Sequence, residues 1–302
     1  MCLIDQLCIA TGLDACLVYR AKAFHLPVTA VPELPEVETI RLDLQPLVLG
    51  RTIVEAWVAA NAPRLVQLLP PAKFCRALAG QRIEELSRRG KYLLFHLASG
   101  LVWVVHLRMT GSLQHHTTGC PDDPHLRARF RLSDGTWLCY IDLRKLGMMW
   151  LLEDASQVIG RLGPEPLREG FGPAELGRIL QRRRASVKAV LLDQGAIAGL
   201  GNIYTDEALF AAKIDPRRAA NSLSEKEGKG LHTAIRQVLV EALGDRGSSF
   251  RDYVDATGHE GWHQFHVKVF RCTGQPCYEC GAAIQRIKVG GRSTHFCPRC
   301  QE

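Results

Sequence analysis

The feature that most constrains the fold is a group of four cysteines within the last 26 residues of this 302-residue chain. They form two Cys-x2-Cys pairs separated by 16 residues: Cys277, Cys280, Cys297 and Cys300. Two such pairs at this separation suit tetrahedral binding of one Zn²⁺ by thiolates, and two disulfides are the alternative. A module this small buries too little apolar surface to fold alone, so the metal would hold it together. Four protein ligands leave no open coordination position, which indicates structural rather than catalytic zinc.

The segment between the two cysteine pairs alternates in polarity around Gly290 and Gly291, which predicts a two-stranded hairpin. Cys272 is an additional thiol that we do not expect to be a ligand. The other cysteines of the eleven are scattered singly, which predicts free thiols in a reducing compartment.

Upstream of this module, the pattern predicts an α+β protein with several domains. A helix is expected from Pro35 to about Val48, and residues 52–152 then form short apolar bursts separated by turn signals, typical of an antiparallel β-sandwich or barrel. A segment rich in glycine and proline near 160–173 marks a boundary, after which the pattern becomes helical. The predicted domains are 32–160, 165–262 and 266–302, preceded by a leader over 1–31.

The charge and hydropathy of the chain restrict its partners only mildly. The chain carries 38 basic and 31 acidic residues, a net charge of +7, which fits a polyanionic partner. An ordinary basic cytosolic enzyme is the alternative on charge alone. No apolar run approaches the roughly 20 residues that a bilayer-spanning helix needs, so no membrane partner is expected.

The stretch GLGNIY, which starts at Gly199, joins two helical patterns. Gly199 and Gly201 permit a tight turn, and Asn202 is predicted to be the N-cap of the following helix. Backbone N–H groups at such a helix start attract phosphate, and basic residues that include Lys188 lie just upstream. Simple capping of a helix pair is the alternative.

A third motif, PELPEVE, begins at Pro32. Together with GLGNIY and the cysteine module, it resembles the formamidopyrimidine-DNA glycosylase family over about residues 32–302. The resemblance implies an N-terminal antiparallel β-sandwich with flanking helices, a helix-two-turn-helix domain and a C-terminal β-hairpin zinc finger. It also implies a monomeric base-excision repair enzyme of the bacterial cytoplasm that binds damaged double-stranded DNA. Such an enzyme removes oxidised purines (8-oxoguanine and formamidopyrimidines) and then nicks the strand as an abasic-site lyase.

The resemblance implies that Pro32 is the nucleophile through a free secondary amine. An α-amine has a pKa of roughly 7.7–8.0, so part of it is unprotonated near neutral pH. It would attack the sugar, displace the damaged base and form a Schiff base. Glu33 matches the general acid/base of the family, Glu36 a supporting carboxylate, and Lys91 a lysine that holds a phosphate and assists catalysis.

The resemblance also implies that the target nucleotide is flipped out of the duplex. Met109 and Arg144 match two residues of a wedge that fills the gap, and Leu146 stands where the family has phenylalanine. Leucine supplies apolar bulk but stacks less well than phenylalanine, which affects the expected lesion preference. Residues near 247–262 correspond to a loop that caps the extruded base. Three residues match phosphate-contacting positions: Lys188, Asn202 and Arg292.

The leader conflicts with this chemistry because the nitrogen of Pro32 inside a peptide bond is a tertiary amide and is not nucleophilic. We expect a misassigned start site, with Val31 encoded by a GUG initiator codon. Proteolysis after Val31 is a second possibility, and an intact leader with no glycosylase activity is a third.

Three other functions compete with this interpretation. The endonuclease VIII-type branch prefers oxidised pyrimidines, but it usually begins PEGPE, and Leu34 favours the purine branch. A non-catalytic, zinc-containing DNA-binding protein is expected if the leader is retained. An RNA-binding module is disfavoured because the match extends to Pro32 and Glu33.

Overall fold

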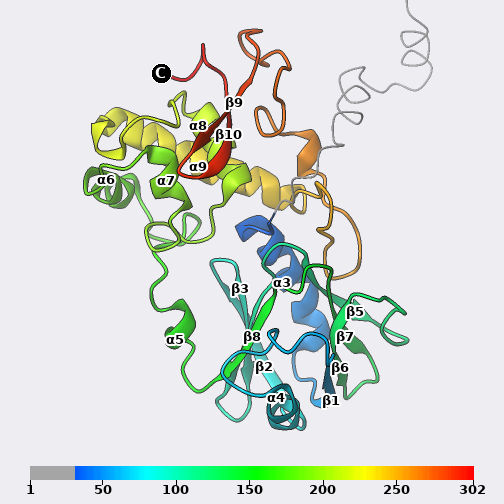
Figure 1. Ribbon diagram of the computed structural model, residues 1–302. Helices are drawn as coiled ribbons and strands as arrows, with labels where there is room; N and C mark the ends of the chain where they lie inside the picture. Colours follow the sequence, from blue (N-terminus) through cyan, green and yellow to red (C-terminus); the bar gives the residue numbers. More distant parts are fainter. Residues whose placement is uncertain (1–30) are drawn as a thin grey trace, which may run out of the picture.

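The computed structural model describes residues 31–302, which form two lobes (Figure 1). The strands β1–β8 gather in one lobe, and the helices α6–α9 gather in the other together with the hairpin β9–β10. Residues 1–30 of the predicted leader lie outside the described residues.

The N-terminal lobe begins with helix α3 (Leu34–Val48) and contains two four-stranded antiparallel sheets. The first sheet has the order β1-β6-β7-β5, with β1 (Ile53–Val58), β6 (Leu126–Leu132), β7 (Trp137–Asp142) and β5 (Gly111–His116). The second has the order β2-β3-β4-β8, with β2 (Ile83–Arg89), β3 (Tyr92–Leu97), β4 (Val102–His106) and β8 (Met148–Leu152). This arrangement confirms the predicted antiparallel β domain.

The core of this lobe is aromatic at its centre. The ring of Trp103 lies 4.5 Å from the ring of Phe95 and 4.5 Å from the ring of Phe130, measured between centroids. Ile40 and Leu44 of α3 belong to the same buried cluster. One face of α3 therefore packs on the sheets, as its spacing of apolar residues predicts.

The sequence pattern does not predict β2, β5, β8 or the short helix α4 (Pro71–Leu78). In β2 the register shifts between Ile83 and Glu85, so its buried residues Ile83 and Leu86 are three apart instead of two. β5 contains one aliphatic residue, Leu113. These strands are stabilised by pairing with neighbours, which outweighs their weak local pattern.

The second lobe is built around α8 (Asn202–Ala211), which is buried at eight of its ten positions. Around it lie α6 (Pro173–Gln181), α7 (Val187–Leu192) and α9 (Glu225–Gly244). Shorter turns are α5 (Ser156–Ile159), η1 (Ala220–Ser222) and η2 (His263–Phe265). The helices predicted after the glycine- and proline-rich boundary are confirmed. No helix between residues 31 and 302 has both the length and the apolar character needed to cross a bilayer.

The predicted hairpin is also confirmed, as β9 (Gln285–Val289) and β10 (Arg292–Phe296). It is anchored to α8 by Asp206, whose carboxylate accepts the backbone N–H of His295 at 2.9 Å. The same carboxylate accepts the Lys188 ammonium at 2.6 Å, and that ammonium also donates to the Ser293 carbonyl at 2.8 Å. Helices α7 and α8 and the hairpin are thus joined through one buried ion pair.

The phosphate contact of Lys188 stays a prediction, and the structure shows which protein groups its ammonium contacts. The side chains of Lys188 and Asp206 have no solvent exposure, so the ammonium faces a carboxylate and a carbonyl instead of solvent. A basic run near a phosphate-binding turn looks the same in sequence whether a given lysine points outward or inward. In the structure, Lys188 holds the hairpin against the helices.

A disulfide joins Cys120 to Cys139, which contradicts the prediction that the scattered cysteines are free thiols. Cys139 lies on β7, and Cys120 lies in the loop after β5, the strand that pairs with β7. The two cysteines are neighbours through sheet pairing, which their separation of 19 residues does not reveal. Cys75 is a free thiol.

We predict that Lys188→Met lowers the free energy of unfolding by about 3–5 kcal/mol, because it leaves the Asp206 carboxylate buried without its cation. The double variant Lys188→Met/Asp206→Asn should regain part of that loss. Lys226→Met is the control at an exposed position and should change stability by no more than about 0.5 kcal/mol. Denaturant unfolding monitored by tryptophan fluorescence measures all three. Equal stability of Lys188→Met and the control would show that the ion pair is unimportant.

Candidate active site

The candidate site lies where the start of α3 meets the turn before α8. The Leu34 N–H donates to the Gly199 carbonyl at 3.0 Å. The carboxylate of Glu33 accepts the N–H of Gly201 at 2.6 Å and the N–H of Ile203 at 2.9 Å. Glu33 therefore caps a helix that begins about 170 residues later, and the cap joins the two lobes.

This arrangement corrects the predicted N-cap. Gly201 is the N-cap residue of α8, and Asn202 is the first helical residue. The Asn202 Oδ1 atom is buried and has no hydrogen-bond partner among residues 31–302. Local sequence favours asparagine as a cap, but the carboxylate of Glu33 arrives from the other lobe and takes that position.

The two glycines of the turn provide room for the start of α3. A Cβ on Gly199 would lie 2.7 Å from the Leu34 side chain, and the residue has φ of +97°. A Cβ on Gly201 would lie 2.3 Å from the Glu33 carboxyl carbon. The sequence predicts turn glycines here, and the structure adds that the close approach of residues 33 and 34 requires them.

Glu36 is a second buried carboxylate beside Glu33, and it accepts several hydrogen bonds. One of its oxygens accepts the Glu33 N–H at 2.8 Å. The other accepts the Ser248 N–H at 2.8 Å and the hydroxyl of Tyr204. Glu36 thus connects α3, α8 and the loop that follows α9, which suits a supporting residue.

The electrostatics of the site favour proton transfer near neutral pH. Burial raises the pKa of Glu33 to about 7, the positive charge of Lys91 opposes this rise, and Glu36 adds to it. Burial lowers the pKa of Lys91, and although both carboxylates oppose this, the charge of Arg292 lowers it further. A carboxyl group whose pKa is near 7 can donate and accept a proton at physiological pH.

Lys91 lies at the tip of the β2–β3 hairpin and forms no hydrogen bond or ion pair with residues 31–302. The hairpin tip is fixed by Arg88, which donates to the Glu165 carboxylate at 2.8 and 3.0 Å and to Glu38 at 2.7 Å. Glu165 also accepts the N–H of Gly90. No local sequence signal identifies Arg88 or Glu165, because their pairing spans 77 residues.

The predicted wedge residues lie on two neighbouring loops. The Arg144 guanidinium donates to the sulfur of Met109 at 3.3 Å, and Leu146 is 39% exposed. Asp142, which is buried, holds these loops together by accepting the Thr110 hydroxyl at 2.5 Å and the Arg144 N–H at 3.1 Å. The structure therefore brings an exposed arginine and an exposed apolar side chain to one edge of the first sheet.

Arg292 is exposed at the first position of β10. Its charge acts on both Lys91 and Lys188, which places the hairpin tip close to the candidate site. The backbone of the tip packs on α7, since a Cβ on Gly290 would lie 3.3 Å from the Ala189 side chain. Lys91 and Arg292 therefore supply positive charge from both lobes.

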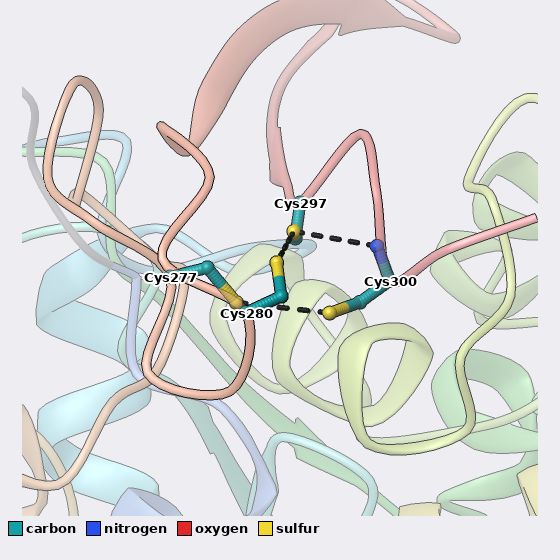
Figure 2. A group of neighbouring side chains, drawn as sticks. All are labelled: Cys277, Cys280, Cys297 and Cys300. Carbon is teal, nitrogen blue, oxygen red and sulfur yellow. Dashed lines mark hydrogen bonds between the residues drawn. The ribbon is translucent and has the colours of Figure 1, made fainter.

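The four predicted metal ligands form one cluster (Figure 2). The sulfurs of Cys277 and Cys300 are 3.8 Å apart, and those of Cys280 and Cys297 are 3.4 Å apart. Tetrahedral zinc with Zn–S bonds of about 2.3 Å places its sulfurs about 3.8 Å apart, so the geometry fits zinc. These separations exclude the alternative of two disulfides. Cys272 is not part of the cluster, as predicted.

Gly201→Ala is predicted to lower the free energy of unfolding by about 1–3 kcal/mol, because the added methyl group overlaps Glu33. Gly230→Ala is the matched control: it lies within α9, has open space around its Cβ, and should stabilise the protein by up to about 1 kcal/mol. The loss in free energy of unfolding caused by Gly201→Ala should be smaller in a Glu33→Ala background, where the overlap is removed. If Gly201→Ala lowers the free energy of unfolding equally with and without the Glu33 side chain, the proposed contact is contradicted.

Comparison with known domain families matches most of the chain. Residues 31–149 match the formamidopyrimidine-DNA glycosylase N-terminal domain, and residues 162–253 match the H2TH domain of the same enzyme. Residues 274–302 match a zinc finger found in FPG and IleRS. The last match, together with the cysteine cluster, confirms one structural zinc site.

Curated relatives and solved structures agree with these matches. The chain is 46% identical over 275 residues to formamidopyrimidine-DNA glycosylase of Desulfitobacterium hafniense, covering 90% of this chain and 100% of the relative. It is 45% identical over 276 residues to the Bacillus subtilis protein of that name, covering 90% and 99%.

The fold resembles Lactococcus lactis Fpg in complex with DNA containing an abasic site, with a TM-score of 0.82, 38% identity, and coverage of 89% and 99%. It also resembles that protein in complex with Fapy-dG-containing DNA, with a TM-score of 0.81, 37% identity, and coverage of 89% and 100%. The identity, the coverage and the three matched domains confirm the resemblance, and the chain belongs to the formamidopyrimidine-DNA glycosylase family.

Proposed function

We propose that this protein is a DNA glycosylase and abasic-site lyase that removes oxidised purines from duplex DNA. The observation that carries the proposal is the buried Glu33 carboxyl, whose pKa is raised to about 7 beside Pro32 at the meeting point of the two lobes. The solved relatives are complexes with abasic-site and Fapy-dG DNA, which supports the substrate class.

In the proposed reaction, the lone pair of a free Pro32 nitrogen attacks the sugar C1′, and the bond from C1′ to the damaged base breaks. The proton that the amine loses goes to the departing base. Glu33 in its carboxyl form donates a proton as the sugar ring opens, and the product is an iminium between Pro32 and C1′. The iminium acidifies the C2′ proton, so loss of that proton expels the 3′ phosphate and cuts the strand. A second elimination expels the 5′ phosphate, and water releases the enzyme.

Binding in this proposal depends on positive charge and on the wedge. Lys91 and Arg292 would hold phosphates near the lesion, and the backbone start of α8 with Asn202 would hold another. Met109, Arg144 and Leu146 would enter the base stack where the nucleotide leaves it. The structural zinc keeps the hairpin that carries Arg292 folded. Since the Desulfitobacterium hafniense and Bacillus subtilis relatives are bacterial, the proposal places this protein with the chromosome in the cytoplasm.

The proposal requires that Pro32 be the chain terminus in the active protein. An acylated proline nitrogen has its lone pair delocalised into the carbonyl group and cannot form the iminium. We propose that translation starts at the Val31 codon, read as a GUG initiator, and that the initiator residue is then removed. The N-terminal domain family match, which begins at residue 31, supports this.

We predict that a protein beginning at Pro32 is trapped covalently by borohydride on abasic-site DNA, and that the 302-residue chain with its leader intact is not. Reduction converts the iminium to a stable amine, and peptide mass spectrometry should locate the DNA adduct at Pro32. Intact-mass measurement of the longer chain is the control for removal of the leader. If the intact longer chain is trapped equally well, another group is the nucleophile. If neither protein is trapped, a non-catalytic DNA-binding protein is the better description.

The rate of base excision under single-turnover conditions should pass through a maximum between about pH 7 and 8, because the amine must be unprotonated and Glu33 protonated. Since burial raises the pKa of Glu33 to about 7, the proton-donating form is lost as the pH rises through that value. Glu33→Gln should slow excision by about 10²–10⁴-fold and remove the falling limb. Glu225→Gln, at an exposed glutamate, is the control. A falling limb that persists in Glu33→Gln would contradict the assignment.

The choice of substrate separates the purine branch from the endonuclease VIII-type alternative. The rate of base excision is measured on duplexes that carry 8-oxoguanine opposite each of the four bases and on duplexes that carry an oxidised pyrimidine. We expect faster excision of 8-oxoguanine. Preferential excision of the oxidised pyrimidine would favour the alternative.

A further inference from the structure

Two histidines and an aspartate form a cluster that the proposed reaction does not use. The Asp245 carboxylate oxygen Oδ2 lies 2.9 Å from Nδ1 of His263 and 2.6 Å from Nδ1 of His266. All three potential ligand atoms lie within 4.8 Å of one another. The cluster is separate from the four cysteines and has a different donor set, with two nitrogens and one oxygen.

We propose that Asp245, His263 and His266 bind one divalent transition-metal ion, and that Zn²⁺ is the ion expected. Two imidazoles and a carboxylate are donors that suit zinc and neighbouring first-row ions. Each neutral imidazole would move its proton from Nδ1 to Nε2, which frees Nδ1 to coordinate. Water would complete the coordination, because one side of the cluster is open to solvent.

The geometry needs only a small adjustment. A tetrahedral ion with bonds of about 2.0–2.1 Å holds its ligand atoms about 3.3 Å apart. The observed separations of 2.9 and 2.6 Å are shorter, so both imidazole nitrogens would move away from the carboxylate oxygen as the ion enters. The His263 side chain is 4% exposed and is fixed, and Asp245 is the C-cap residue of α9. The His266 side chain is 59% exposed, so it has room to rotate toward the ion.

The cluster lies at the base of the loop over residues 246–262. The Trp262 N–H donates to the Asp245 carbonyl at 2.8 Å, and the His263 N–H donates to the Gly247 carbonyl at 3.0 Å. A bound ion would therefore join the two ends of this loop. His263 also lies against Tyr204, with ring centroids 5.7 Å apart, and the Tyr204 hydroxyl donates to Glu36. The inferred ion would thus strengthen the loop that borders the candidate active site.

Cobalt titration tests this inference and does not depend on catalytic activity. The four-cysteine site is first loaded with zinc, excess metal is removed, and Co²⁺ binding is followed by visible absorption and by metal content per chain. We expect one additional equivalent of Co²⁺, with d–d bands but without the thiolate charge-transfer band that replacement at the cysteines would produce.

His266→Gln and Asp245→Asn should weaken Co²⁺ binding by about tenfold or more. His259→Gln, an exposed histidine on the same loop, should bind like the unmodified protein. Amide exchange within residues 246–262 should slow on addition of metal in the unmodified protein and not in His266→Gln. Equal cobalt binding by His266→Gln and the unmodified protein, absence of the additional equivalent, or a thiolate band alone would overturn the inference.

Discussion

The carboxylate of Glu33 joins the two lobes by accepting the backbone N–H groups of Gly201 and Ile203 at the start of α8. These N–H groups have no partner within the helix, and the helix dipole favours a negative charge at this end. The hydrogen bonds favour the charged carboxylate and lower its pKa. Burial disfavours the charged form and outweighs them, which raises the pKa of Glu33 to about 7. The contact therefore fixes the lobes, and burial at their junction leaves a carboxyl group suited to proton transfer.

The rest of the site follows from this contact. Close approach of α3 to the turn requires glycine at positions 199 and 201, and it brings Glu36 to Tyr204 and Ser248. The lobes are further joined by the Arg88–Glu165 pair, which fixes the hairpin tip that carries Lys91. In the proposed reaction, chemistry and DNA contacts would therefore occur at the boundary between lobes, where a shift of one lobe would move Arg292 relative to Pro32 and Glu33.

Sequence predicted those parts of the fold that local spacing determines. The spacing of four cysteines predicts the zinc cluster and hairpin, and apolar periodicity predicts α3 and the helices of the second lobe. Contacts between distant residues were not predicted: the cap of α8 comes from Glu33 instead of Asn202, Lys188 is buried against Asp206, and Cys120 pairs with Cys139. Each depends on which surfaces meet after folding, and local preferences do not contain that information. The family resemblance identified the candidate site residues, whereas their hydrogen-bond partners required the structure.

Amide hydrogen exchange measured by NMR, on protein beginning at Pro32, tests the central interaction most directly. We predict that the N–H groups of Gly201 and Ile203 are protected, and that Glu33→Ala accelerates their exchange strongly while amides in the middle of α9, such as that of Leu239, are unaffected. Unchanged protection of Gly201 and Ile203 in Glu33→Ala would show that another group caps α8 and would contradict the account.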